Sequence, residues 1–288
     1  MEKDSDRLKK PDWLKVKLPD VEEYSKMKHV LGAKHLHTIC ESGACPNKGE
    51  CWGAGTATFM ILGNICTRSC RFCNVETGKP LPPDKYEPLK VAEAVLQMNL
   101  KHVVLTSVDR DDLSDSGACH WSQTIKIIKN ISPETTIEAL IPDMKGNVID
   151  LQTIMSAEPD IISHNLETVK RLSKEVRVKA DYDTSLRVIG FISESGIPSK
   201  SGIMLGLGET DAEVLETMDD LFAVGCRIIT LGQYLQPTHK HLPVKRYVSP
   251  EQFDNYKTIA FNKGFKFVES APLVRSSYRA ERHINKSI

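Results

Sequence analysis

Residues 57–73 of the chain read ATFMILGNICTRSCRFC, a short apolar run followed by three closely spaced cysteines. The run at 57–63 predicts a buried β-strand, because strands covered on both faces are continuous apolar segments. Cys66, Cys70 and Cys73 come directly after it. The stretch therefore predicts a strand that leads into a compact loop carrying three thiols.

The same kind of strand recurs along the chain and alternates with helical patterns. Further strands are expected at 102–107 (HVVLTS), 136–141 (TIEALI), 160–164 (DIISH), 202–206 (GIMLG) and 227–231 (RIITL). Helices are expected at 89–98, 121–129, 148–155, 184–194 and 212–224. This alternation predicts an α/β protein with a parallel sheet, because parallel neighbours need crossover helices. A partial or complete barrel fits better than two domains, and a doubly wound open sheet is the alternative.

Composition narrows the class of protein. The 288 residues include 38 Lys or Arg and 38 Asp or Glu, and this balance argues against a surface devoted to nucleic acid. No apolar run approaches the ~18 residues that cross a bilayer. Residues 1–39 are charged, show no clear strand and lack the apolar stretch of a signal peptide, so we expect an arm. The composition favours a soluble, cytoplasmic protein without membrane or nucleic-acid partners.

A parallel barrel places its active groups in the loops that leave the carboxyl ends of its strands. After the first strand, these positions hold Asp109, Arg110, Asp111, Asp112, Asn165, Glu167, Glu209, Gln233, Tyr234 and Gln236. The charged run 109–112 fits a ligand contact and a solvated loop equally well. The segment SHNLET at 163–168 also fits an N-capped helix start. Gln233, Tyr234, Gln236, His239 and His241 are candidates for lining a substrate channel.

The cysteines form two triplets and two single residues. Cys40, Cys45 and Cys51 precede the first strand, whereas Cys119 and Cys226 stand alone and are expected to be small buried apolar residues. In a reducing compartment, clustered thiols indicate a metal site more often than disulfides. Structural zinc and simple electron-transfer clusters usually take four protein ligands, whereas a four-iron cluster held by three cysteines leaves one iron open to an external ligand.

Several motifs in fixed order carry a resemblance to a known family. They are CESGACPNKGECW from Cys40, CTRSCRFC from Cys66, TSVDRDDL from Thr106, SHNLET from Ser163, GLGET from Gly206, GQYLQPT from Gly232, HLPVKRYVSPEQF from His241 and RSSY from Arg275. Together they resemble the lipoyl synthase family of the radical S-adenosylmethionine (SAM) superfamily over nearly the whole chain. The biotin-forming sulfurtransferase, an iron–sulfur carrier and a zinc-stabilised binding module are the alternatives.

The resemblance implies a fold, a reaction and a set of ligands. The fold is a (β/α)6 partial TIM barrel at 55–250 with extensions at 1–54 and 251–288. The reaction is sulfur insertion at carbons 6 and 8 of a protein-bound N6-octanoyl-lysine, with an auxiliary cluster as the sulfur donor. Two [4Fe–4S] clusters and SAM are expected. The implied radical-cluster ligands are Cys66, Cys70 and Cys73, and the implied auxiliary ligands are Cys40, Cys45, Cys51 and Ser277.

The same resemblance assigns a catalytic role to Ser277 besides the three radical-cluster cysteines, although spacing alone leaves Ser276 open as the ligand. SAM binding is expected at Asn165, Glu167, Gly206 and Glu209. Implied partners are an octanoylated lipoyl carrier domain or glycine cleavage H protein, a reduced donor of ferredoxin or flavodoxin type, and an iron–sulfur carrier. An acidic carrier is expected to meet Lys240, Lys245, Arg246, Arg275, Arg279 and Arg282.

Overall fold

The computed structural model describes residues 8–15, 21–43, 45–53 and 56–284. Its main element is an eight-stranded sheet with the order β1-β2-β5-β6-β7-β8-β9-β10. The strands are β1 (His37–Thr38), β2 (Thr56–Ile61), β5 (His102–Ser107), β6 (Thr136–Leu140), β7 (Ile161–Ser163), β8 (Ser199–Leu205), β9 (Ile228–Gln233) and β10 (Phe267–Ser270). Strand β1 runs antiparallel to β2, and every other neighbouring pair is parallel.

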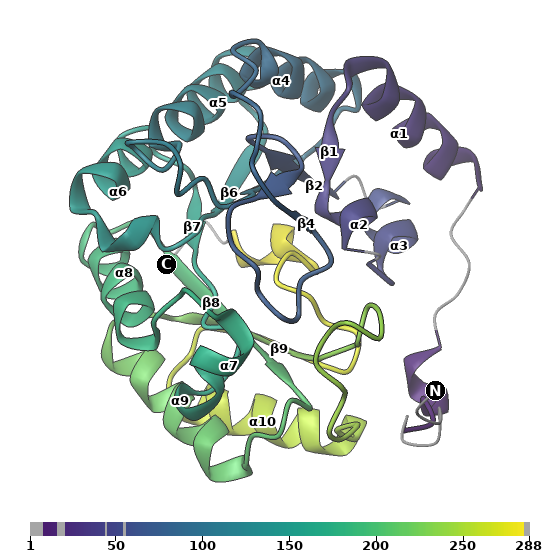
Figure 1. Ribbon diagram of the computed structural model, residues 1–288, viewed down its shortest axis with the longest axis vertical. Coiled ribbons are helices and arrows are strands. Elements are labelled where there is room, and N and C mark those ends of the chain that lie inside the picture. Colours follow the sequence, from purple (N-terminus) through teal and green to yellow (C-terminus); the bar gives the residue numbers. More distant parts are fainter. Residues whose placement is uncertain (1–7, 16–20, 44, 54–55, 285–288) are drawn as a thin grey trace.

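Helices cover the outer side of this sheet. They are α4 (Glu87–Gln97), α5 (Ala118–Ile131), α6 (Val148–Met155), α8 (Tyr182–Glu194), α9 (Asp211–Ala223) and α10 (Pro250–Asn262). Figure 1 shows them as an arc around the curved row of strands. Strands β1 and β10 remain the two edges of the sheet, so the barrel is not closed. The partial barrel is confirmed, and the doubly wound alternative is wrong because the helices lie along one side of the curved sheet.

The predicted elements agree with the observed ones to within a few residues. All five predicted helices and all six predicted strands are present. The prediction missed β10, the seventh parallel strand, which continues the sheet beyond β9. It is four residues long, and only every second residue is buried, so its apolar signal in the sequence is weak.

The expectation of an arm at the N-terminus is wrong for its described part. Residues 1–7 and 16–20 lie outside the described residues, but α1 (Val21–Lys34) packs against α3 (Lys48–Gly53) and α4. Strand β1 pairs with β2 at His37 and Thr38. This strand is too short to produce an alternating pattern, so only the tertiary pairing defines it.

The C-terminal segment returns to the inside of the barrel. After β10 it turns through the buried Val274 and ends in a short 3₁₀ helix, η5 (Ala280–His283), whose Ala280 and His283 are buried. This helix contacts β5, and Figure 1 shows the yellow C-terminal segment within the arc of strands. No helix in the described ranges is long and apolar enough to cross a membrane.

Candidate active site

The loop that carries Cys66, Cys70 and Cys73 is set by a tight turn at the end of β2. Leu62 and Gly63 have φ angles of 68° and 93°, and the left-handed region is costly for a leucine. The Leu62 N–H donates to Glu87 Oε2 at 2.7 Å, and its carbonyl accepts from Arg110 Nη1 at 3.2 Å. These two partners hold the turn that points the loop away from the sheet.

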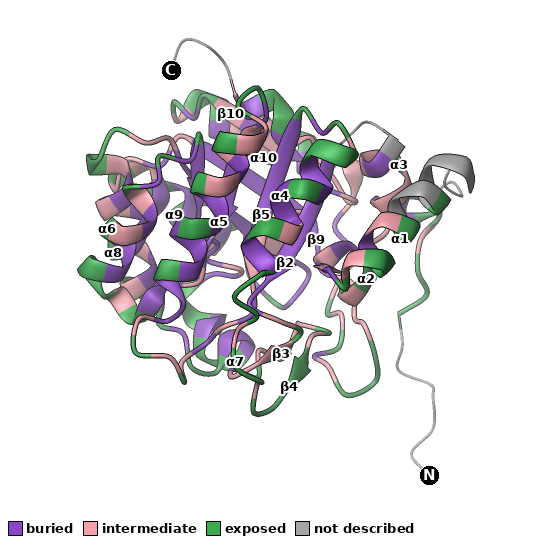
Figure 2. Cartoon of the chain, turned by 90° about the horizontal axis from the view of Figure 1, so that it is seen from above, coloured by how far each residue is buried: buried purple, intermediate pink, exposed green. Residues whose placement is uncertain are grey.

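Beyond the turn, the loop folds back on itself at the carboxyl ends of the strands. The short strand β3 (Ile65–Cys66) pairs in parallel with β4 (Glu76–Thr77). Figure 2 shows β3, β4 and α7 (Ser173–Arg177) together at one end of the barrel, below the buried strands. The Arg71 N–H donates to the Val176 carbonyl at 2.9 Å, so α7 supports the loop from the side.

The three thiols of the loop are partly exposed and have defined neighbours. Cys66 Sγ accepts from the backbone N–H groups of Arg68 at 3.4 Å and Asp109 at 3.3 Å. Cys70 Sγ donates to the Arg177 carbonyl at 3.5 Å. Hydrogen bonds from N–H groups to sulfur are the contacts that favour thiolates at a metal centre.

The electrostatics of this loop favour the protonated form of its thiols. Burial, followed by the charge of Asp109, raises the pKa of Cys70 to about 12. Burial also raises the pKa of Cys73 to about 11, and repulsion from Cys66 adds to it. Thiols bind metals only as thiolates, so a cationic group is required to hold all three deprotonated.

No three Cys, His, Asp or Glu side chains of the described chain lie close enough together to hold a single metal ion. Ligands of a four-iron cluster occupy separate corners of a larger group. The three spaced thiols of the 66–73 loop therefore fit a cluster better than one ion.

The second triplet, Cys40, Cys45 and Cys51, lies at the start of the barrel, with Cys40 on α2 (Ile39–Ser42), Cys51 on α3 and Cys45 between the two helices. The Cys45 N–H donates to the Cys40 carbonyl at 3.1 Å, which brings the first two cysteines together. Burial raises the pKa of Cys40 to about 11, and repulsion from Cys45 adds to it. Burial raises the pKa of Cys51 to about 12, again with repulsion from Cys45 and Cys40. These three thiols also need a cationic group to be deprotonated together.

The RSSY segment lies beside this second triplet. Asn47 Nδ2 donates to the Leu273 carbonyl at 2.6 Å. The Tyr278 hydroxyl donates to Glu50 Oε1 at 3.0 Å, and Arg279 lies 3.3 Å from the same oxygen. The tertiary structure thus brings together two predicted parts of one site that lie at opposite ends of the sequence.

Asn165 connects the RSSY segment with the predicted SAM site. Its Nδ2 donates to Ser276 Oγ at 2.6 Å and to Glu167 Oε1 at 3.0 Å. Asn165 is buried, and its Oδ1 has no hydrogen-bond partner among the described residues. A buried acceptor without a partner is costly, so it marks a place where a ligand can donate a hydrogen bond.

The expectation of an N-capped helix at SHNLET is wrong. Glu167 has a φ angle of 65° and forms an isolated parallel bridge with Ile203. The next helical turn begins only at Lys170. Because Glu167 donates its N–H to Gly202 and accepts from Met204, the segment is pinned to β8 instead of starting a helix.

Gly206 and Glu209 shape the loop after β8. The Glu209 carboxylate accepts the N–H groups of Gly206 at 2.6 Å and Leu207 at 2.9 Å. Gly206 has a φ angle of 99°, and a Cβ there would lie 2.2 Å from Gln233 Nε2. Only glycine fits, because the backbone conformation and the close approach both exclude a side chain.

Two predicted channel residues have other partners, and this expectation is wrong for them. Gln233 and Tyr234 are buried. Gln233 Nε2 donates to the carbonyls of Leu205 and Arg246, each at 3.0 Å. The Tyr234 hydroxyl donates to the Leu242 carbonyl at 2.8 Å. Both side chains hold the loop that follows β9.

The loop after β9 packs on the loop that carries Cys66, Cys70 and Cys73. His241 Nε2 lies 2.9 Å from the Cys73 carbonyl, and its Nδ1 lies 2.8 Å from Thr238 Oγ1. His241 thus contacts the loop that carries Cys66, Cys70 and Cys73. His239 is exposed.

The predicted docking residues divide into two groups. Lys240, Lys245 and Arg282 are exposed, and Arg282 Nε lies 4.0 Å from Glu281 Oε1. Arg246 pairs with Asp211 at 3.0 Å, Arg279 is held by Glu50, and Arg275 Nη1 donates to the Val274 carbonyl at 2.7 Å. These three arginines contribute to internal contacts, so the predicted patch is smaller than the sequence indicates.

The charged run 109–112 supports the loop that carries Cys66, Cys70 and Cys73 through Asp109, whereas Asp112 at its end is exposed. Asp109 is partly buried and Arg110 is buried. Sequence reasoning missed the partner of this run, Arg68, and a further carboxylate, Asp143. Arg68 lies within the motif CTRSCRFC, but the spacing of the motif points to the role of the cysteines and gives no signal for the arginine.

The two single cysteines differ from each other. Cys226 is buried, as predicted, whereas Cys119 is exposed, so the expectation for Cys119 is wrong. Cys119 lies in the first turn of α5, and its N–H donates to Asp115 Oδ2 at 3.0 Å. The amphipathic face of α5 turns this position to solvent.

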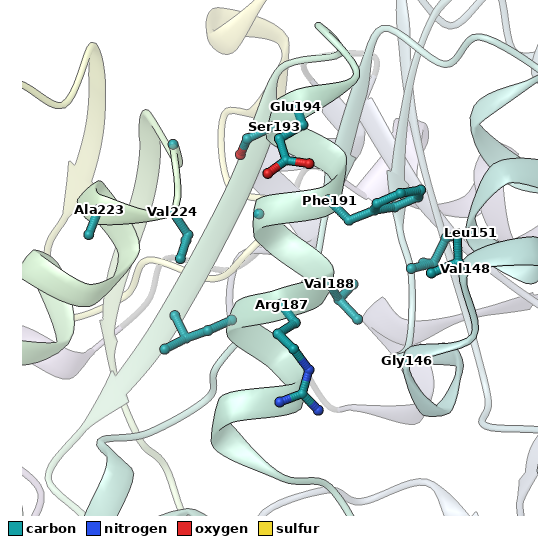
Figure 3. A pocket seen from close by; sticks show the side chains of 13 residues that line it. Gly146, Val148, Leu151, Arg187, Val188, Phe191, Ser193, Glu194, Ala223 and Val224 are labelled. Atoms are coloured by element: carbon teal, nitrogen blue, oxygen red, sulfur yellow. The ribbon is translucent and has the colours of Figure 1, made fainter.

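A separate groove of about 800 Å³ lies on the helical layer. Figure 3 shows side chains from α8, among them Val188, Phe191 and Glu194, together with Leu151 of α6 and Val224 after α9. None of the predicted ligands lines it. The groove is therefore distinct from the cysteine sites.

Comparisons with known proteins agree with the geometry. Residues 60–221 match the radical SAM superfamily, and residues 1–45 match the N-terminal domain of lipoyl synthase of the radical SAM family. A lipoyl synthase of Bacteroides thetaiotaomicron is 61% identical over 280 residues, which cover 97% of this chain and 99% of that protein. A lipoyl synthase of Treponema denticola is 58% identical over 276 residues, or 96% and 95% of the two chains.

The chain belongs to the lipoyl synthase family. As a member of this radical SAM family it is a sulfurtransferase that uses SAM and [4Fe–4S] chemistry. Solved structures confirm the fold. Methylornithine synthase (PylB) aligns over 93% of this chain and 86% of its own with a TM-score of 0.53 and 13% identity. SuiB of Streptococcus suis with its precursor peptide aligns over 99% and 61% with a TM-score of 0.59 and 12% identity.

Proposed function

We propose that the chain inserts sulfur at carbons 6 and 8 of an octanoyl group that is amide-linked to a lysine of a carrier protein, and so forms the lipoyl group. The observation that supports this most directly is the position of the RSSY segment beside Cys40, Cys45 and Cys51, within reach of the SAM residues through Asn165. The carbons to be sulfurated bear unactivated C–H bonds, which no side-chain base can deprotonate at a useful rate.

In this proposal, Cys66, Cys70 and Cys73 hold one [4Fe–4S] cluster, and Cys40, Cys45, Cys51 and Ser277 hold a second. When bound, the first cluster with SAM supplies a 5′-deoxyadenosyl radical that abstracts hydrogen, and the second cluster supplies sulfide. Three protein thiolates would leave one iron of such a cluster without a protein ligand, and SAM would bind at that iron. The N–H groups of Arg68 and Asp109 donate to Cys66 Sγ and stabilise it as a thiolate.

Asn165, Glu167, Gly206 and Glu209 form the proposed SAM-binding set. The free Oδ1 of Asn165 is the acceptor available to a hydroxyl or ammonium donor of SAM. Burial raises the pKa of Glu167, so a cationic or hydroxyl donor nearby stabilises its carboxylate. Glu209 and Gly206 act differently, by closing the loop against which the nucleoside packs.

The proposed partners follow from the same chemistry. The substrate arrives on an octanoylated lipoyl domain or H protein. The exposed Lys240, Lys245 and Arg282 are the part of the predicted basic patch that remains available to an acidic carrier. A reduced ferredoxin or flavodoxin supplies electrons, and an iron–sulfur carrier rebuilds the second cluster. This set of partners favours a cytoplasmic location.

The test uses anaerobically reconstituted full chain, an octanoyl-lysine peptide, SAM and reductant. We expect mass spectrometry to show addition of two sulfurs to the peptide, with release of 5′-deoxyadenosine. Cys45→Ala should abolish sulfur insertion and retain some nucleoside release, whereas Cys70→Ala should abolish both. Sulfur insertion by Cys45→Ala at the rate of the unchanged chain would contradict the proposal.

A further inference from the structure

Arg68 lies between the first two cysteines of the 66–73 loop and is 7% exposed. Its guanidinium forms two forked pairs. Nε and Nη2 contact the Asp111 carboxylate at 2.9 and 2.8 Å. Nη1 and Nη2 contact the Asp143 carboxylate at 2.9 and 2.8 Å. Asp109 Oδ1 lies 3.3 Å from Nε as a third acidic neighbour.

The carboxylates come from two other strands of the barrel. Asp111 follows β5 and Asp143 follows β6, so Arg68 joins the cysteine loop to two neighbouring strand ends. The carboxylates are themselves held in place. The Asp143 carboxylate accepts the Lys145 N–H at 3.0 Å, and the Asp111 N–H donates to Thr67 Oγ1 at 3.0 Å. The loop, the guanidinium and the acidic residues thus form one connected network.

This network includes the peptide units that flank Cys66. The Thr67 N–H donates to the Asp109 carbonyl at 3.1 Å, and the Thr67 hydroxyl donates to the same carbonyl at 2.9 Å. The Arg68 and Asp109 N–H groups both point at Cys66 Sγ. The position of the sulfur therefore depends on the same residues that contact the guanidinium.

We propose that Arg68 is a positioning residue that holds the Cys66–Cys70 segment in its cluster-binding conformation before a cluster arrives. This inference rests on the proposed role of Cys66, Cys70 and Cys73 as cluster ligands. A loop without such an anchor loses conformational freedom when the cluster binds, and that cost weakens binding. A loop that is already fixed loses less conformational entropy on binding. It therefore binds the cluster more tightly, and we expect it to release the cluster more slowly.

The geometry requires arginine at this position. Two carboxylates are each bound by two N–H groups of one planar fork, and a lysine ammonium cannot reproduce that arrangement. Lysine keeps the positive charge, so Arg68→Lys separates geometry from charge. A charge-balanced variant, Arg68→Gln with Asp143→Asn, removes one positive and one negative charge together.

The same loop offers a matched control. Arg71 lies three positions further on and is 51% exposed in its side chain, with one contact to Glu175 at 3.5 Å. Exposed pairs of this kind contribute little to stability. Arg71→Lys therefore makes the same chemical change in the same loop without touching the buried network.

The experiment measures how fast chelator removes iron from the reconstituted full chain without oxygen. The iron and the reduced-state electron paramagnetic resonance signal that Cys70→Ala lacks are assigned to Cys66, Cys70 and Cys73. We expect Arg68→Lys to lose this iron at least ~tenfold faster than the unchanged chain, and to broaden the signal, because its buried pairs are incomplete. Arg71→Lys should stay within about twofold of the unchanged chain.

Thermal unfolding of the cluster-free chains separates positioning from general folding. Arg68→Lys and the charge-balanced variant are expected to remain folded at the temperature of the assay and still to release iron quickly. Iron release at the unchanged rate in both variants would overturn the inference, as would equal acceleration in Arg71→Lys. If the unchanged chain takes up no cluster on Cys66, Cys70 and Cys73, the proposed function itself fails, and the two failures are therefore distinguishable.

Discussion

The neighbouring serines of RSSY have different surroundings. Ser276 Oγ accepts a hydrogen bond from Asn165 at 2.6 Å, which directs it toward the proposed SAM site. This contact occupies Ser276 and supports Ser277 as the fourth ligand of the second cluster. A serine oxygen is a harder ligand than a thiolate and matches a soft iron site poorly, so we infer that its iron is the one most easily lost.

The serine assignment leads to a paired test. We expect Ser277→Ala to lose iron from the second triplet, from about eight irons per chain toward about four, because the cluster lacks its fourth protein ligand. Ser276→Ala should retain the iron and weaken SAM binding through the loss of the Asn165 contact. Iron analysis and SAM titration measure the two effects. Retention of all iron in Ser277→Ala together with loss in Ser276→Ala would reverse the assignment.

The proposed lability of the iron bound by Ser277 has its own test. If the weak oxygen ligand lets the cluster open when sulfur leaves, Ser277→Cys should bind the cluster more firmly and slow formation of the carbon–sulfur bonds. Mass spectrometry of the peptide product measures both bonds. An unchanged yield of both would contradict the idea.

Strand β9 and the C-terminal segment approach each other closely at Gly232. A Cβ at Gly232 would lie 2.0 Å from the Val274 carbonyl oxygen, a distance that no side chain can occupy. Val274 immediately precedes RSSY in the sequence. The register of the segment over β9 therefore determines where the serines lie.

Substitution of this glycine tests the packing of the segment. We expect Gly232→Ala to lower the free energy of unfolding by about 1–3 kcal/mol, because the carbonyl must move, and to lower iron binding at the second triplet. Gly190→Ala is the control. It lies inside α8, and its new Cβ would be 3.6 Å from Val224, so it should raise stability by about 0.5–1 kcal/mol. Denaturant titration measures both changes, and a neutral Gly232→Ala would be inconsistent with the close approach.

The barrel also contains buried charged and titratable groups besides the cysteines. Lys200 Nζ contacts both oxygens of Glu138 at 2.9 Å, and both side chains are fully buried. Burial lowers the pKa of His102 to about 3 and, together with the charge of Lys200, lowers the pKa of His283 to about 2. Burial also lowers the pKa of His164 to about 4. These histidines are neutral in the folded protein.

The neutral histidines predict that acid weakens the fold. Below pH ~6.5 the unfolded chain binds protons that the folded chain does not, so stability is present above that pH and falls as the pH drops toward 4. Each neutral histidine lowers the free energy of unfolding by about 1.4 kcal/mol for every pH unit below its unfolded pKa. At pH 5.5 the three histidines together therefore lower it by about 4 kcal/mol. Denaturant titrations at pH 7.0 and 5.5 measure the difference.

A variant pair isolates one contribution. His283→Phe should reduce the pH dependence by about a third, since one of the three groups no longer titrates. His239→Phe, at an exposed position, should leave it unchanged. An unaltered slope in His283→Phe would show that this imidazole is charged or exposed in the folded protein.

The sequence by itself determined the barrel strands from β2 to β9, their covering helices and both cysteine triplets. Strands such as β2 are buried at every position, and so their apolar runs are continuous and visible. The cysteines are visible because thiols bind metals through the side chain alone, whatever the backbone around them.

Only the tertiary structure decided which distant residues meet. Arg68 pairs with Asp143 across 75 positions, and Asn47 meets the C-terminal segment across 226. Neither pairing leaves a periodic pattern in the sequence, because each depends on where strand ends and loops come together. The same holds for Gln233, a polar residue at a strand end that proved to hold backbone carbonyls. Composition and spacing specify which groups are present, whereas packing specifies their partners.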